Sequence, residues 1–153
     1  MPEIELSMGY MLNWSARLVR RLADRRMKTL GLSAGHLPVI NALAENEPMS
    51  QKALAAYASI EQPTMAATLA RMERDGLVER QPDPQDGRSA LFWLTAATRK
   101  KLPAMRAAIK GMDAEVLAAL PEHLRQPFRR QLRMTLDGME ARAAADAAKS
   151  EGG

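Results

Sequence analysis

The sequence predicts a mainly α-helical fold that carries one small β-hairpin. Aromatic residues make up only 4% of the 153 residues and cysteine is absent, so the core must come from Leu, Ala, Met, Ile and Val, which together favour helices. Apolar residues recur at helical spacing along most of the chain. Only residues 77–94 alternate as strands do, on both sides of a turn-forming cluster.

Two helices are predicted in the first third of the chain. The first runs from about 7 to 30 and ends at Gly31, with five arginines between the apolar residues of its amphipathic pattern. These arginines either form a solvated face or touch phosphate. Ser33 is a good N-cap for a second helix, over about 34–45.

A short third helix is predicted over about 51–57. Ser50 is its N-cap, and Leu54 and Tyr57 are its inward residues. A break at 58–59 makes a tight turn toward the next helix.

The fourth helix opens with Ser59 and Gln62, which have the spacing of a capping box. Pro63 suits its first turn, because the early N–H groups of a helix have no partner inside it. Gly76 ends the helix. Its apolar face repeats at i, i+4 and i+7, at Met65, Leu69 and Met72.

A hairpin follows, with strands at 77–80 and 89–94 around a dense turn cluster at 82–87. Two strands alone are only marginally stable, so the hairpin must pack against helices. The faces of its second strand alternate, with Leu91 and Trp93 on one side and Phe92 and Leu94 on the other.

Two long helices complete the chain. Thr95 caps one that runs to about Leu120, and Pro103 inside it predicts a kink or a late start. The other covers about 122–145. Its apolar row and the region of Leu12 and Leu18 give more apolar surface than a small domain needs, so they are buried in a dimer or in the chain's own core. The row consists of Leu124, Phe128, Leu132 and Leu136.

Short helix, tight turn, second helix and hairpin is the order of a winged helix-turn-helix, which places its second helix in the DNA major groove. Side chains on the outward face of that helix can bond base edges, although an ordinary polar face has the same composition. They are Gln62, Thr64, Thr68 and Arg71.

The turn of the hairpin offers a further contact. Arg88 can reach phosphate or the minor groove, and Asp86 can hold its guanidinium through a bidentate pair. The alternative is a turn-stabilising Asp beside a solvated Arg.

Net charge does not by itself indicate a nucleic-acid partner. The chain carries +4, but its parts before residue 47, from 47 to 94 and after 94 carry +2, −2 and +4. The predicted DNA-reading segment is therefore acidic, and a winged helix that binds protein instead of DNA is an alternative.

The stretch Asp83-Pro84-Gln85-Asp86-Gly87-Arg88 resembles the wing signature D-P-x-D-x-R of the multiple antibiotic resistance regulator (MarR) family. Gln62-Pro63-Thr64 and the runs 69–78 and 89–95 also match the family's pattern, so that the specific match spans about 45 residues.

This resemblance implies a homodimer, often a repressor, with interlocking terminal helices and with small phenolic or other aromatic effectors bound between its lobes. It makes helix 61–75 the recognition helix and places Arg88 in the minor groove with Asp86 as its partner. It also implies phosphate contacts for Arg74 and Lys52.

We therefore expect one MarR-type chain over 1–153, with a DNA-binding lobe at 34–94 and dimerisation helices at 7–30 and 96–145. The expected function is sequence-specific regulation of transcription by a homodimeric repressor that a small aromatic ligand releases from double-stranded operator DNA. The alternative is a constitutive or architectural DNA-binding module that senses no ligand.

The candidate effector site consists of Trp14, Arg17 and His36, if the first two helices pack as the resemblance implies. A phenolate or carboxylate would be held by His36 and Arg17 against Trp14, and the alternative is a capping or packing histidine.

No cofactor or metal is expected, because the two histidines are isolated and cysteine is absent. No nucleophile–base pair, carboxylate dyad or glycine-rich phosphate loop indicates an enzyme. No apolar run is long enough for a membrane span and the first residues lack a signal-peptide core, so a cytoplasmic location is expected.

Overall fold

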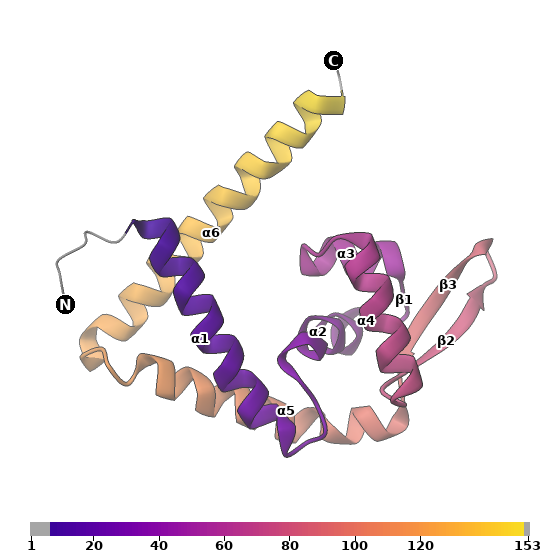
Figure 1. Cartoon of the computed structure of the whole chain (residues 1–153), viewed down its shortest axis with the longest axis horizontal. Helices are drawn as coiled ribbons and strands as arrows, with labels where there is room; N and C mark the ends of the chain where they lie inside the picture. Colours follow the sequence, from indigo (N-terminus) through magenta and orange to yellow (C-terminus); the bar gives the residue numbers. More distant parts are fainter. Residues whose placement is uncertain (1–6, 152–153) are drawn as a thin grey trace. The chain divides into compact units, whose positions relative to one another are not determined.

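The computed structural model describes residues 7–151, with side chains up to residue 149, and divides the chain into two units, 1–112 and 113–153. None of the helices over 7–151 combines the length and apolar character that a membrane crossing requires. The elements, in chain order, are α1 (Met8–Lys28), the 3-10 turn η1 (Ala34–His36), α2 (Leu37–Asn46), β1 (Met49–Ser50), α3 (Gln51–Ala58), α4 (Gln62–Arg74), β2 (Val78–Asp83), β3 (Asp86–Leu94), α5 (Ala96–Leu117) and α6 (Glu122–Glu151) (Figure 1).

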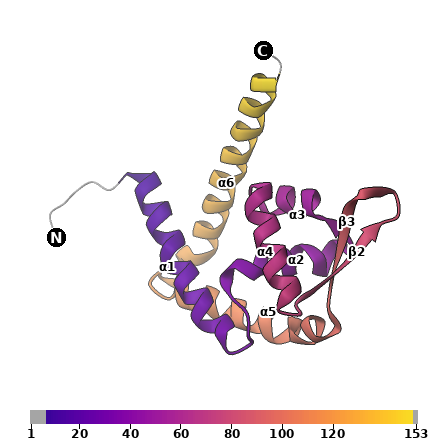
Figure 2. The ribbon, with the colours of Figure 1, turned by 45° about the vertical axis from the view of Figure 1, so that its right-hand side comes forward.

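The predicted fold class is confirmed: the chain is mainly helical and contains a winged helix-turn-helix. In Figures 1 and 2, α3 and α4 lie together over α2, and the β2–β3 hairpin projects beside α4. Gly31 and Gly76 end α1 and α4 with φ angles of 68° and 69°. This left-handed backbone costs glycine no strain, which is why the two sequence-predicted helix ends fall where they do.

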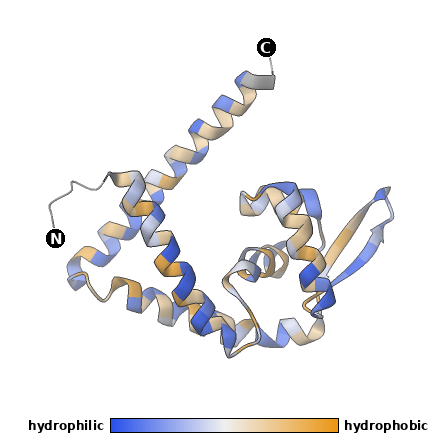
Figure 3. Cartoon of the chain, in the orientation of Figure 1, coloured by the Kyte–Doolittle hydropathy of each residue, from blue (hydrophilic) through white to orange (hydrophobic). Residues whose placement is uncertain are grey.

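The core of the helix-turn-helix forms where α2, α3 and α4 meet the base of the hairpin. Met65, Leu69 and Met72 are at most 2% exposed, as their spacing predicted. They pack in one cluster with residues of α2, which is orange along much of its length in Figure 3. Full burial of one such side chain contributes about 1.5–3 kcal/mol, so this stripe fixes the orientation of α4.

The sheet has three antiparallel strands in the order β1-β3-β2, and the expectation of two strands was therefore wrong. Met49 of β1 pairs with Phe92, but a strand of two residues is too short to show a period in the sequence. The hairpin strands are also longer than predicted, leaving only residues 84–85 between β2 and β3. Pro82 is tolerated because β2 is an edge strand.

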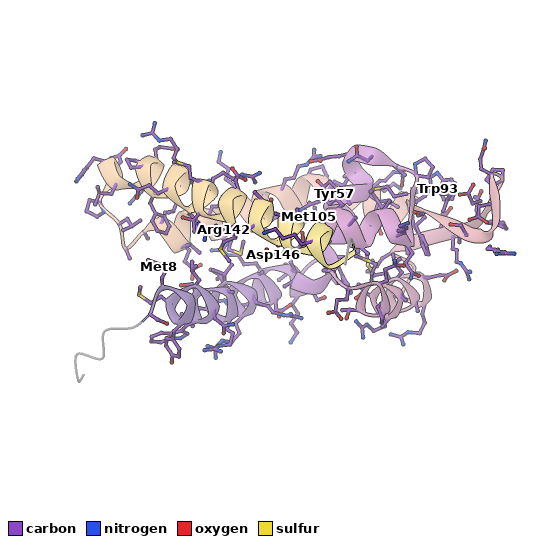
Figure 4. The ribbon with its side chains drawn as sticks, turned by 90° about the horizontal axis from the view of Figure 1, so that it is seen from above. Met8, Tyr57, Trp93, Met105, Arg142 and Asp146 are labelled. Atoms are coloured by element: carbon purple, nitrogen blue, oxygen red, sulfur yellow. The ribbon has the colours of Figure 1, made fainter. Side chains whose placement is uncertain are left out.

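Two details of the helix-turn-helix differ from the prediction. Ser59 does not cap α4; it ends α3 in the left-handed region, with φ of 51°, while an N-cap requires extended backbone. Glu61 precedes α4 instead. Tyr57 is not an inward residue: its side chain is 47% exposed, and its hydroxyl donates to Glu45 Oε2 at 2.9 Å (Figure 4).

The first turn of α5 is bonded to the end of α4 and to the hairpin. Thr95 Oγ1 accepts from the Thr98 N–H at 3.1 Å and donates to the Gly76 carbonyl at 2.9 Å. Thr98, 1% exposed, donates to the Leu77 carbonyl at 2.8 Å. Glu47 accepts the Leu94 N–H and pairs with Arg99. The cap predicted at Thr95 is thus confirmed.

The late start that Pro103 suggested for this helix is wrong, because α5 begins at Ala96 and runs through the proline. Pro103 is the eighth residue of α5, where a proline removes one i→i−4 hydrogen bond while the turns on both sides keep their own. The helix therefore continues to Leu117.

Two helices carry apolar side chains that the described chain does not bury. On α1, Met11, Trp14 and Leu18 are 38–48% exposed. On α6, which belongs to the second unit, Leu124, Phe128 and Leu136 are 42–44% exposed in one row. Surface helices of a monomer seldom expose such rows.

Candidate nucleic-acid interface

A groove of about 410 Å³ lies between the helix-turn-helix and the hairpin. It brings together residues of α3, α4, β2 and β3 that are up to 41 positions apart in the sequence. Its polar lining consists of Gln51, Lys52, Gln62, Glu73, Arg80, Arg88 and Ser89. Three predicted DNA-binding residues, Lys52, Gln62 and Arg88, therefore share one site.

Local structure explains how each wall of the groove is built. Ser50 Oγ accepts the Ala53 N–H at 3.2 Å and so starts α3, which places Lys52 in its first turn. In the hairpin, Arg80 pairs with Phe92 across the strands. Because strand side chains alternate between faces, Arg80, Arg88 and Phe92 lie on the face that borders α4.

The outward face of α4 differs in part from its predicted composition. With Met65, Leu69 and Met72 buried, the helical repeat of about 100° per residue places small residues at the centre of the exposed side. They are Pro63, Ala67 and Ala70, followed by Arg74. Ala67 and Ala70 were not predicted as part of the outward face, because only hydrogen-bonding side chains were considered there. The same periodicity identifies both alanines.

Helical periodicity places Thr64, Thr68 and Arg71 on the edge of α4 away from the hairpin. Thr68 is half-buried, and its hydroxyl donates to the Thr64 carbonyl at 2.9 Å. Arg71 donates to the same hydroxyl at 3.4 Å, so Thr68 orients the guanidinium. Arg74 is exposed and pairs with Asp75 at 3.0 Å. An exposed pair of this kind contributes about 0–1 kcal/mol and is readily exchanged for phosphate.

Asp86 shapes the tip of the hairpin. Its Oδ1 accepts the backbone N–H of Arg88 at 3.0 Å, and Asp83 Oδ1 likewise accepts the Gln85 N–H at 2.8 Å. The bidentate Asp86–guanidinium pair is not among the contacts of the described residues. The turn-stabilising alternative is the one observed, since a carboxylate two residues before an N–H closes an Asx turn with little strain. The Arg88 side chain is left exposed at the groove.

The charges of residues 47–94 are sorted in space. This segment contains five cations and seven anions. Three of the cations, Lys52, Arg80 and Arg88, line the groove, whereas Glu73 is its one acidic lining residue in the described structure. Residues 47–94 thus carry a net charge of −2 although the groove they form is basic. The acidic net charge of this segment is therefore no argument against DNA binding.

The candidate effector residues are not brought together. Trp14 packs edge-to-face on Tyr10, with ring centroids 6.1 Å apart, and Arg17 donates to Asn13 Oδ1 at 2.8 Å. His36 lies near the other end of α1, where Asp24 accepts the Ala34 N–H. Because a helix rises 1.5 Å per residue, the ten residues from Trp14 to Asp24 span about 15 Å.

His36 has a structural contact of its own. Its Nδ1 accepts the Ser33 N–H at 3.2 Å, which requires the neutral ring. Burial lowers the pKa of His36 below 6.5, and the charge of Arg71 acts in the same direction, against Asp75 and Asp24. This arrangement matches the packing or capping histidine that the sequence left as an alternative.

A pH dependence of stability follows from His36. Below pH 6.5 the unfolded chain takes up the His36 proton before the folded chain does, so acidification lowers the free energy of unfolding. We expect His36→Gln to lose less stability than the parent between about pH 7.5 and about pH 5.5, as measured by urea unfolding. His123→Gln on α6 is the control and should follow the parent. Equal losses in the parent and His36→Gln would contradict the assignment.

Sequence comparisons assign the chain to a family. A model of the MarR family matches residues 30–89. YwoH of Bacillus subtilis, described as an uncharacterized HTH-type transcriptional regulator, is 30% identical over 127 residues, which are 83% of this chain and 92% of the relative. The chain belongs to the MarR family. It is thus a member of a family of DNA-binding transcriptional regulators, and not of an enzyme family.

Solved structures agree with the MarR fold. A MarR transcriptional regulator from Methanosarcina mazei Go1 matches with a TM-score of 0.80 at 20% identity, covering 88% of this chain and 96% of that one. The Mycobacterium tuberculosis regulator MOSR, solved in complex with DNA, matches with a TM-score of 0.73 at 27% identity, covering 88% and 97%. The MarR architecture therefore extends over most of this chain, well beyond the 60 residues of the family match.

Proposed function

We propose that this MarR-family protein is a homodimer that binds double-stranded operator DNA through α4 and the hairpin. In this proposal α4 enters the major groove of the DNA, and the hairpin tip reaches the adjacent minor groove. The DNA backbone between these two contacts then lies in the protein groove formed by α3, α4 and the hairpin. The observation that carries the proposal is the meeting of Lys52, Gln62 and Arg88 in one basic groove. The DNA complex of MOSR supports it.

The side chains divide by chemistry into readers and positioning contacts. Gln62, Thr64 and Arg71 are proposed to bond base edges, with Thr68 orienting Arg71. The alanines between them allow close approach to thymine methyl groups. Lys52 and Arg74 are assigned to phosphate, and Asp86 holds the turn that presents Arg88.

Dimerisation is assigned to the apolar rows of α1 and α6. A second copy of the chain would cover Met11 and Leu18 on α1 and Phe128 and Leu136 on α6, all of which are exposed. Two copies would then present two recognition helices to two half-sites of a pseudo-palindromic operator.

The regulation that we propose is release of a repressor by a small aromatic or phenolic anion. Trp14 offers an exposed ring, and Arg17 lines a hollow on α1 with Arg20, Arg21 and Asp24. A constitutive DNA-binding protein is the second candidate, favoured by the separation of His36 from Trp14 along α1.

The test begins with selection of bound fragments from the genome that encodes the protein. Enrichment of one inverted repeat is expected, and uniform recovery of fragments would contradict sequence-specific binding. The enriched duplex is then challenged with salicylate-like aromatic anions. Release by one of them, reduced in Trp14→Ala, supports the regulated repressor, whereas binding that persists across the panel supports the constitutive protein.

A further inference from the structure

Glu73 lies where a DNA-binding protein gains least from an acidic residue. It lines the groove between the helix-turn-helix and the hairpin, and it also lines an adjoining hollow of about 350 Å³ along the outer part of the hairpin. Arg80 and Arg88 line both hollows as well. A carboxylate at this position faces the same space as the cations that would hold phosphate.

Arg80 lines the groove but was not among the DNA-binding residues predicted from the sequence. It pairs with Phe92 across the strands, which places it on the face of the hairpin that borders the groove, and both residues line that groove. Glu79, its neighbour in β2, pairs with Trp93 on the opposite face (Trp93 is labelled in Figure 4). Strand register thus separates two adjacent charged residues, of which only Arg80 lines the groove.

Glu73 makes no contact in the described residues that would explain a structural role. The side chain is exposed, and within the described residues neither Glu73 nor Arg80 makes an ion pair or a side-chain hydrogen bond. Both charges therefore remain available to whatever enters the groove. The other acidic residues of 47–94 do not line the groove, so Glu73 is its one carboxylate among the described residues.

We propose that Glu73 limits binding of the DNA backbone: its carboxylate repels a phosphate that enters the groove and competes with that phosphate for Arg80. The inference rests on the proposed function and adds to it a residue that sets the strength of sequence-independent binding. Each phosphate that a protein neutralises adds about 0.9 to the salt dependence of affinity, and a competing carboxylate cancels part of that gain.

Glu73→Gln is the direct test, with affinities measured by fluorescence anisotropy on operator DNA and on an unrelated duplex at several salt concentrations. We expect affinity for the unrelated duplex to rise about fivefold at low salt, and the slope of log affinity against log salt to steepen by up to about 0.9. Operator affinity should rise as well. Unchanged affinity for both duplexes overturns the proposal, as does a loss confined to operator DNA, which would make Glu73 a base reader.

A double-mutant cycle tests whether Glu73 lowers DNA affinity through its competition for Arg80. Arg80→Gln should weaken binding to both duplexes and flatten the salt slope by about 0.9. In the Arg80→Gln background, the gain from Glu73→Gln should fall below half of its value in the parent. An undiminished gain overturns the assigned partnership.

Glu79→Gln is the matched control, because it removes the same charge one residue from Arg80 on the opposite face. It should change affinity by less than twofold, and a gain equal to that of Glu73→Gln overturns the proposal as a general charge effect. Thermal unfolding confirms that each variant folds. A folded parent that binds neither duplex refutes the proposed function and this inference together, whereas a parent that binds and a silent Glu73→Gln refute the inference alone.

Discussion

Arg88→Ala is expected to lower affinity for operator DNA by about 5-fold to 150-fold, the range that roughly 1–3 kcal/mol of lost contact represents. The wing guanidinium is exposed at the groove, and Asp86 bonds the backbone N–H of Arg88 instead of its side chain. Truncation therefore removes the contact and leaves the turn intact. The free energy of unfolding should change by no more than about 0.5 kcal/mol.

Arg142→Ala is the control for the loss of one positive charge. Arg142 lies on α6, outside the DNA-binding lobe, so operator affinity should stay within about twofold of the parent at moderate salt (Figure 4). Anisotropy titrations and urea unfolding of the three proteins give the comparison. If Arg88→Ala and the parent bind operator equally, the wing does not contact DNA.

Phe128→Glu is expected to convert the proposed dimer into a monomer and to reduce operator affinity by at least about 100-fold. A carboxylate in the centre of the α6 row would have to be desolvated against apolar side chains of the partner, which costs several kcal/mol. The monomer would then bind one half-site instead of two and lose the gain from simultaneous engagement.

Met134→Glu matches this change on the other side of α6. Met134 is 72% exposed, and helical periodicity places it away from the row that contains Phe128 and Leu136. It should remain dimeric in sedimentation velocity. Circular dichroism shows whether Phe128→Glu is folded, and Leu136→Glu provides a second disruption. Folded dimers of both row variants would refute the assignment of α6 to the interface.

The sequence predicted most elements because their information is local. Spacing identified Met65, Leu69 and Met72, and Ser50, Gly76 and Thr95 marked helix ends through contacts within a few residues. The errors arose where local rules compete. Ser59 and Gln62 have capping-box spacing, but Ser59 is the C-cap of α3 and has left-handed backbone angles. It therefore cannot adopt the extended backbone that an N-cap of α4 requires.

The candidate site was predicted only in part, since it depends on contacts distant in the sequence. Arg80 became a groove residue through its register with Phe92, twelve positions later, which no local pattern reveals. Glu73 could not be placed without knowing which edge of α4 faces the hairpin. Three groove residues were nevertheless identified from the sequence: Arg88 by the wing motif, Gln62 by the periodicity of the fourth helix, and Lys52 by the family resemblance.

The bonds at the first turn of α5 have a mechanical consequence. Thr95 and Thr98 hold the end of α4 through Gly76 and Leu77, while Glu47 fastens the base of β3 to the same turn. The end of α4 and the base of β3 are thus attached to the same turn of α5. In the proposed complex with DNA, this shared attachment would couple the position of α4 in the major groove to that of the hairpin in the minor groove.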